Sequence, residues 1–154
     1  MSTISTEIII NADIQKVYNF SKEIEQFPGF MPDVKSIEII ERVLSENGIM
    51  YTSNWVGYIK EFNLNVKWTE IDVWNDVKKT CTFEMPAGKG DYEIYKGVWS
   101  FFSNEDGSTL VTMELEVEYN VPMIGGLIKK LIAKLVKSNA NGMLEAIKNQ
   151  VENK

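Results

Sequence analysis

The side chains that most often carry catalysis or bind metal ions are scarce in this sequence. It contains no histidine and one cysteine, Cys81. This composition excludes Ser-His-Asp and Cys-His pairs, histidine zinc sites, paired redox cysteines and disulfides within the chain. We therefore expect no metal ion and no cofactor, and any function has to come from acids, tyrosines or the binding of a ligand.

Two groups of oxygen-bearing side chains remain as candidates for proton transfer. Tyr95 and Tyr119 lie on the expected inner faces of strands, where a phenol can donate a hydrogen bond or a proton. Glu84, Asp91 and Glu93 flank the loop 86–90, and an acid at the mouth of a cavity can have a raised pKa and act as a general acid or base. The simpler interpretation is that the tyrosines pack and the acids are solvated charges beside a turn. We accordingly assign no catalytic residue.

Three further features are better explained by structure than by chemistry. Arg42, the only arginine, lies in the alternating stretch 37–44, so we expect it on the solvent-exposed face. Cys81 alternates with Phe83 and is expected to be a small buried residue. The loop 86–90 lacks the pattern of a phosphate-binding loop and is best explained as a strand connection.

The alternation of apolar and polar residues predicts most of the secondary structure. It predicts a first strand over Ser2–Ile10 and six more strands between Val34 and Tyr119. Turn signals such as Asn47-Gly48 and Asp106-Gly107 separate these strands. Because consecutive strands are joined by short turns, they should form an antiparallel meander.

Helices are expected after the first strand and at the end of the chain. The stretch 11–13 offers a helix cap, and apolar residues at helical spacing follow it until Ser21. The stretch 24–32 contains two prolines and a glycine, so it should form only a brief helix before an apolar loop. Pro122 suits the first turn of a helix that continues over 123–152.

These elements fit one domain. A chain of 154 residues with 44% hydrophobic and 25% charged residues can bury one core, and no linker or repeat divides it. We predict a single α+β domain over residues 1–154, in which a seven-stranded, curved antiparallel sheet grips the long C-terminal helix and two short helices lie between the first and second strands. A curved sheet contacts one helix along a line only, so the space beside that line must hold large side chains or a ligand.

Four stretches carry a family resemblance that extends over nearly the whole chain. They are 11–13 followed by Val17-Tyr18, the aromatic and proline-containing stretch 27–32, Gly97 with Trp99 and Phe101, and 138–148 in the last helix. Their order and spacing resemble the START-like (SRPBCC) helix-grip superfamily, and in particular its polyketide cyclase/dehydrase and lipid-transport group, which includes coenzyme Q-binding proteins. The resemblance implies a cavity for a sterol, lipid, quinone, plant hormone or polyketide intermediate, without identifying the ligand.

Large side chains on the predicted inner faces are the candidate ligand-binding residues. For any one of them, packing in a core is the more common role. A core built only for packing, however, contains few tryptophans and tyrosines, because their N–H and O–H groups need partners. The candidates are Trp68, Phe83, Tyr95, Trp99, Phe101, Met113, Tyr119, Met143 and Ile147.

The sequence supports three hypotheses about function. The preferred one is the binding or transport of a hydrophobic small molecule, such as a lipid, a quinone or a polyketide-like compound, between the sheet and the last helix without covalent chemistry. The first alternative is a polyketide aromatase/cyclase or dehydratase, in which Tyr95, Tyr119 or a rim acid acts on a bound apolar substrate. The second is a protein-interaction module that acts through its outer surface. A fully packed interior would leave only the surface role.

Charge is distributed unevenly along the chain, whose net charge is −6. Residues 121–154 carry six lysines and two glutamates, so the rest of the chain is strongly acidic and a DNA-binding surface is not expected. The lysines of the last helix accompany a wide apolar stripe, which is compatible with weak contact to an anionic membrane surface, with a homodimer or simply with solubility. We recognise neither a signal peptide nor a membrane span, and a cytoplasmic location is the expectation.

Overall fold

The order of elements is one strand, two short helices, six further strands and a long helix. In a computed structural model that describes residues 2–119 and 126–153, these elements are β1 (Ser2–Ile10), α1 (Ile14–Ser21), η1 (Ile24–Gly29), β2 (Val34–Ser45), β3 (Gly48–Ile59), η2 (Lys60–Phe62), β4 (Leu64–Asn75), β5 (Thr80–Glu84), β6 (Tyr92–Ser103), β7 (Thr109–Tyr119) and α2 (Gly126–Glu152). The two helices η1 and η2 are 3₁₀ helices. The predicted fold class is confirmed.

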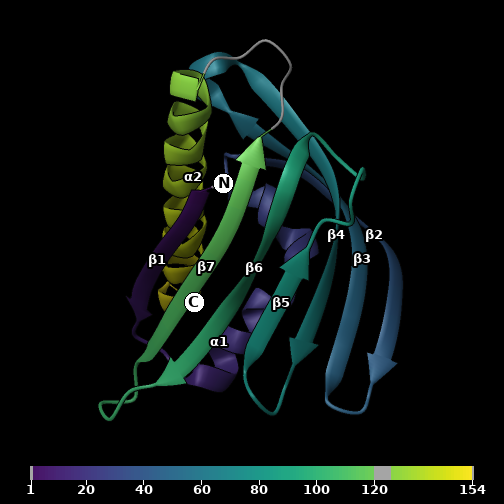
Figure 1. Ribbon diagram of the computed structural model, residues 1–154. Helices are drawn as coiled ribbons and strands as arrows, with labels where there is room; N and C mark the ends of the chain where they lie inside the picture. Colours follow the sequence, from purple (N-terminus) through teal and green to yellow (C-terminus); the bar gives the residue numbers. More distant parts are fainter. Residues whose placement is uncertain (1, 120–125, 154) are drawn as a thin grey trace.

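The strands form one antiparallel sheet. Their order is β1-β7-β6-β5-β4-β3-β2, so the meander from β2 to β7 closes against β1, which pairs with the last strand. Figure 1 shows the sheet curving around the helices, with α2 beside β1 and β7 and α1 behind β5 and β6. The inner face of this curved sheet is where the core and the candidate site lie.

Local sequence explains where the helices start and which face they bury. The Asp13 side chain accepts a hydrogen bond from the backbone N–H of Lys16 and caps α1. On α2, buried residues recur every three or four positions, which is the spacing of one helix face, and they are Ile132, Val136, Ala140, Leu144, Ile147 and Val151. The predicted C-terminal limit of this helix at Glu152 is confirmed, whereas Pro122 and the predicted first turn at 123–125 lie outside the described residues.

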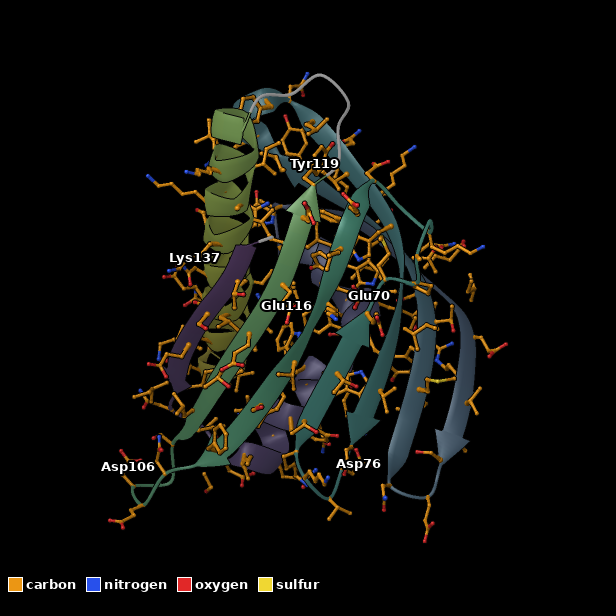
Figure 2. All side chains as sticks on the ribbon, viewed as in Figure 1. Glu70, Asp76, Asp106, Glu116, Tyr119 and Lys137 are labelled. Atoms are coloured by element: carbon orange, nitrogen blue, oxygen red, sulfur yellow. The ribbon has the colours of Figure 1, made fainter. Side chains whose placement is uncertain are left out.

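The basic surface of α2 is solvated in the part whose side chains are described. Lys130, Lys134 and Lys137 are exposed, and Lys137 points away from the sheet (Figure 2). Beside them Leu131 is 43% exposed and Leu135 is half-buried. The apolar stripe is therefore only partly covered here.

Candidate functional site

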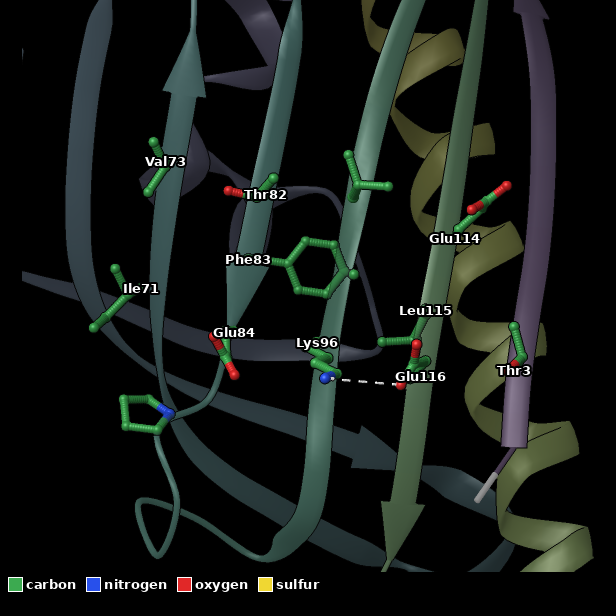
Figure 3. Close-up of a pocket in the computed structure, with 13 residues that line it drawn as sticks. Thr3, Ile71, Val73, Thr82, Phe83, Glu84, Lys96, Glu114, Leu115 and Glu116 are labelled. Atoms are coloured by element: carbon green, nitrogen blue, oxygen red, sulfur yellow. Dashed lines mark ion pairs between the residues drawn. The ribbon is translucent and has the colours of Figure 1, made fainter.

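A broad hollow lies on the outer face of the sheet (Figure 3). It has a volume of about 640 Å³ and is open to solvent. Its lining mixes apolar and charged side chains, and Lys96 and Glu116 form an exposed ion pair at 4.0 Å. The lining includes Ile71, Val73, Thr82, Glu84, Lys96, Val98, Glu114 and Glu116. Sites for apolar ligands enclose most of the ligand's surface, whereas this hollow is open, so it is not the candidate site.

A second pocket lies where the cavity was expected, between the inner face of the sheet and α2. The sheet contributes aromatic rings, and α2 contributes side chains from two consecutive turns. The main lining residues are Trp55, Trp68, Tyr92, Tyr95, Val136, Asn139, Ala140 and Met143. We call this space the inner pocket.

The inner pocket is narrow. Its volume is about 40 Å³, close to the space that one water molecule takes up in the liquid. A larger ligand enters only if lining side chains move. Met143 and Tyr95 are both half-buried, and methionine changes shape more readily than any other apolar side chain. These two residues are therefore the natural points at which the pocket can open.

Four of the nine candidate ligand-binding residues line the inner pocket, namely Trp68, Tyr95, Met113 and Met143. The other five are buried in the surrounding core, namely Phe83, Trp99, Phe101, Tyr119 and Ile147. The ring centres of Phe83 and Tyr95 are 5.7 Å apart, and those of Tyr119 and Tyr92 are also 5.7 Å apart, so two of the five support lining rings. Ligand contact by all nine remains a prediction.

Two carboxylates occupy the inner face of β4. Glu70 is 4% exposed and Asp72 is 2% exposed, and both belong to the buried face of the strand; Glu70 is labelled in Figure 2. The next two outward positions, Ile71 and Val73, are apolar, and Val73 is 43% exposed to solvent. The usual pattern of apolar residues inside and polar residues outside is thus reversed over this part of the strand.

The register of β4 explains why this reversal persists. The strand pairs with β3 residue by residue from Leu64 to Asn75 without a bulge. Trp68 and Trp74 are buried on either side of the two acids and share their face. If the pairing of β4 shifted by one residue, both indoles would be exposed to solvent and the two acids would be hydrated. The free energy lost by exposing the indoles outweighs that gained by hydrating the acids, so the acids stay inside.

The two carboxyl groups are hydrogen-bonded to each other and to one indole. The Trp68 Nε1–H donates to Glu70 Oε1 at 2.7 Å, and the side chains of Glu70 and Asp72 share a hydrogen bond. Among the described residues, Asp72 Oδ1 and Trp74 Nε1 have no partner although both atoms are buried. We refer to Glu70 and Asp72 as the acid pair.

Burial gives the acid pair unusual protonation. The pKa of Asp72 lies well above its usual range because of burial and the adjacent charge of Glu70. Burial also raises the pKa of Glu70, although hydrogen bonds from Asp72 and Trp68 act in the opposite direction. The pair therefore keeps a proton at a pH at which exposed carboxyl groups have lost theirs. It can both donate and accept a proton.

The acid pair lies next to the inner pocket. Burial, followed by the charge of Glu70, raises the pKa of the Tyr95 phenol. Phe83, which pairs with Asp72 across β4 and β5, has its ring centre 5.7 Å from that of Tyr95. Trp68 connects the acid pair to the inner pocket, because its ring lines the pocket and its N–H group donates a hydrogen bond to Glu70. On the neighbouring strands, Ser53 pairs with Glu70, and Tyr51 and Phe83 pair with Asp72.

The other residues considered for chemistry lie elsewhere. Glu84 is exposed on the outer face, and Glu93 is also exposed. Asp91 Oδ2 accepts a hydrogen bond from the backbone N–H of Lys67 at 2.8 Å. Arg42 is half-exposed and forms an ion pair with Glu25. Cys81 is buried, as predicted, and none of these side chains lines the inner pocket.

Sequence reasoning missed several residues of the site, among them Trp55, Tyr92 and the acid pair, and for the acid pair the signal was present. Extending the alternation of β4 beyond Trp68 places Glu70 and Asp72 on the inner face. Trp55 and Tyr92 could not be identified in this way, because their role depends on which strands lie opposite α2.

No three cysteine, aspartate or glutamate side chains within residues 2–119 and 126–153 come together in a way that could hold a metal ion. None of the helices in this part of the chain has the length and apolar character needed to cross a bilayer.

Comparisons with known proteins identify the family and support the fold. The sequence pattern of the family described as polyketide cyclase/dehydrase and lipid transport matches residues 10–144. No curated protein matches the chain. The structure of TTHA0849 from Thermus thermophilus is similar with 28% identity and a TM-score of 0.88, over 99% of this chain and 98% of that chain.

Two more distant structures share the fold. The Zhui aromatase/cyclase from a Streptomyces species has 11% identity and a TM-score of 0.83, over 98% of this chain and 93% of its own. A START superfamily protein from Mycobacterium smegmatis has 17% identity and a TM-score of 0.78, over 98% of this chain and 97% of its own. At these identities the likeness concerns architecture alone.

Proposed function

The chain belongs to the polyketide cyclase/dehydrase and lipid transport family, and from that premise we propose that it binds an apolar, ring-containing small molecule in the inner pocket without covalent chemistry. Membership of the family implies either the binding of a hydrophobic ligand or cyclase activity. The observation that supports binding is the lining of the inner pocket, in which five aromatic residues of the sheet lie opposite residues of α2 that are mostly apolar. Flat rings offer a large contact area to another ring system at a small cost in conformational entropy.

The packing of the rings indicates what shape of ligand fits. Trp55 and Trp68 are stacked with 5.6 Å between ring centres, and Tyr92 and Tyr95 are stacked at 4.7 Å. Trp68 and Tyr95 bring the two stacks together, with 5.0 Å between their centres. A planar ligand can extend such an array when Tyr95 or Met143 turns aside, because it replaces one ring contact with another.

Filling the pocket tests this proposal. Ala140→Leu adds three carbon atoms to a side chain that lines a space of about 40 Å³, so we expect it to weaken the binding of 1-naphthalenemethanol at least about tenfold. Isothermal titration calorimetry measures the affinity. The matched control is Ala133→Leu, because Ala133 is half-buried two turns earlier on α2 and does not line the pocket. Equal affinities in the two variants, or no binding to the unmodified protein, would contradict the proposal.

A cyclase or dehydratase is the second candidate function, and the acid pair is the observation that favours it. A carboxylate and a carboxylic acid side by side can remove a proton from carbon and donate one to oxygen in the same site. The Tyr95 phenol, which lines the pocket, is a further hydroxyl donor for such chemistry.

Tyr95→Phe separates the two candidate functions. In a binding protein the variant should change the affinity for an apolar ring compound by less than about threefold, because the ring is retained. In an enzyme that uses the hydroxyl, it should lower the turnover of a linear poly-β-ketone by about a hundredfold or more. The readouts are calorimetric affinity and product formation followed by chromatography, and turnover that is unaffected by the change would exclude a role for this hydroxyl.

A further inference from the structure

We propose that the inner pocket selects apolar molecules that carry a protonated amino group, with the acid pair and the surrounding rings recognising the ammonium. The inference rests on the proposed function, because it needs the pocket to admit an apolar ligand. It adds the chemical class of the ligand's polar group. Three properties of the described residues support it: an unpartnered acceptor, the absence of lysine and arginine from the lining of the pocket, and the aromatic lining.

The unpartnered acceptor is Asp72 Oδ1. Asp72 is 2% exposed, and this oxygen has no hydrogen-bond partner among the described residues. Buried polar atoms are nearly always hydrogen-bonded, and leaving one unpaired costs free energy. A ligand that brings N–H donors to this oxygen removes that cost, and a ligand that brings only acceptors does not.

The charges around the pocket favour a cation. Asp33 is the one charged residue among those that line it, and no lysine or arginine does so. The ion pairs of the described chain are Lys22–Asp76, Arg42–Glu25, Lys96–Glu116 and Lys148–Glu152, so neither member of the acid pair is neutralised by a basic side chain. A buried carboxylate that has no basic partner repels anions and attracts a cation strongly, because the surroundings are poorly polarisable.

The aromatic lining supplies the remaining contacts of an ammonium group. Trp68 lies 5.5 Å from Tyr92 and 5.0 Å from Tyr95, measured between ring centres, so three aromatic rings meet at the side chain that binds Glu70. One face of the Trp68 ring stacks on Trp55, and the rings of Tyr92 and Tyr95 line the pocket with it. Aromatic faces attract cations, and a carboxylate beside them adds charge and a hydrogen bond.

The arrangement also determines how the ligand lies. Neither acid lines the pocket, and the pair is joined to it through Trp68, which lines the pocket and donates its N–H to Glu70. The apolar body therefore occupies the space beside Val136, Ala140 and Met143, and the amino group reaches past Tyr95 toward β4. A primary or secondary amine suits this position better than a quaternary one, because only the former has N–H groups for Asp72 Oδ1.

Three probes with the same ring system test the proposal by calorimetry. They are 1-naphthylmethylamine, 1-naphthalenemethanol and 1-naphthoate, which present an ammonium, a hydroxyl and a carboxylate. We expect the amine to bind at least about tenfold more tightly than the alcohol, and the carboxylate to bind more weakly than the alcohol. Titrations in two buffers that differ in ionisation enthalpy should also show that the amine releases protons from the protein and that the alcohol does not, because the cation favours the ionised pair.

The variants Glu70→Gln and Asp72→Asn should bring the affinities for amine and alcohol close together, whereas Glu84→Gln on the outer face should preserve the difference. Equal binding of amine and alcohol by the unmodified protein would overturn the inference and leave the proposed function intact. A variant that combines Glu70→Gln with Asp72→Asn and still prefers the amine would also overturn the inference. If none of the three probes binds, the proposed function fails, and the inference fails with it.

Discussion

Asp72→Asn is expected to raise the free energy of unfolding at mildly alkaline pH by about 1–3 kcal/mol, although it changes a fully buried polar residue. The substitution removes an ionisable group from a site that penalises charge. It retains the shape of the side chain and gives Glu70 an amide donor in place of the shared proton. Most substitutions in a core are destabilising, so an increase in stability would be distinctive.

The pH dependence of this effect has a definite sign. Burial raises the pKa of Asp72 and of Glu70 in the folded protein. Their contribution to stability is therefore fully present below the pKa of the unfolded chain and is lost as the pH rises through the folded pKa values. The unmodified protein should lose stability between acidic and alkaline pH, and the loss should be smaller in the variant. Urea unfolding at a series of pH values measures both curves.

Asp76 provides the control with the opposite sign. Its Oδ1 accepts hydrogen bonds from the Tyr18 hydroxyl at 2.7 Å and from the Lys22 ammonium at 2.9 Å. Although its slight burial acts in the other direction, these contacts lower the pKa of Asp76. Asp76→Asn should therefore reduce stability at neutral pH and have less effect in acid. If Asp72→Asn behaved in the same way, the acid pair would not be the strained site described above.

Gly97→Ala is expected to destabilise the fold by about 3 kcal/mol, which is large for the addition of one methyl group. Gly97 lies on β6 between Phe83 of β5 and Leu115 of β7. A Cβ at this position would lie 2.1 Å from the Glu114 carbonyl oxygen and 2.7 Å from the Phe83 ring. The backbone of β7 would have to move, and the ring that supports Tyr95 would be displaced.

Gly29→Ala is the matched control for this prediction. Gly29 ends η1, and a Cβ there would meet no heavy atom within 4 Å. The free energy of unfolding of the Gly29→Ala variant should differ from that of the unmodified protein by less than about 0.5 kcal/mol. Thermal and urea unfolding of both variants test the difference, and similar stability in the two would show that the inner face near Phe83 is loosely packed.

One substitution, Asp72→Asn, tests the effect of the acid pair on both stability and ligand selection. Two buried carboxyl groups in the centre of a sheet reduce stability, and proteins tolerate such violations mainly at sites that bind or react. If Asp72→Asn stabilises the fold and also removes the preference for the amine, the same two residues would account for both effects. If it stabilises the fold and leaves ligand selection unchanged, the pair would be a structural feature without a role in recognition.

The sequence by itself determined the architecture, because secondary structure follows from local periodicity. Alternation with a period of two residues predicted the seven strands, and the three-to-four-residue spacing of apolar residues predicted the end of α2 at Glu152. The same alternation specified the inward face, so Phe83, Trp99 and Phe101 are buried as expected. It placed Glu70 and Asp72 inside too, but a pattern within one strand does not reveal whether such acids are neutralised by a neighbour.

The tertiary structure alone decided which inward residues surround the inner pocket. All nine candidate residues share the inner side of the fold or α2, yet only Trp68, Tyr95, Met113 and Met143 line the pocket. The difference depends on how far the sheet curves and on which strands lie opposite α2, and both result from contacts between residues far apart in the chain. The partners of the acid pair depend on the same contacts, since among the described residues no lysine or arginine forms an ion pair with Glu70 or Asp72, and only the assembled core decides this.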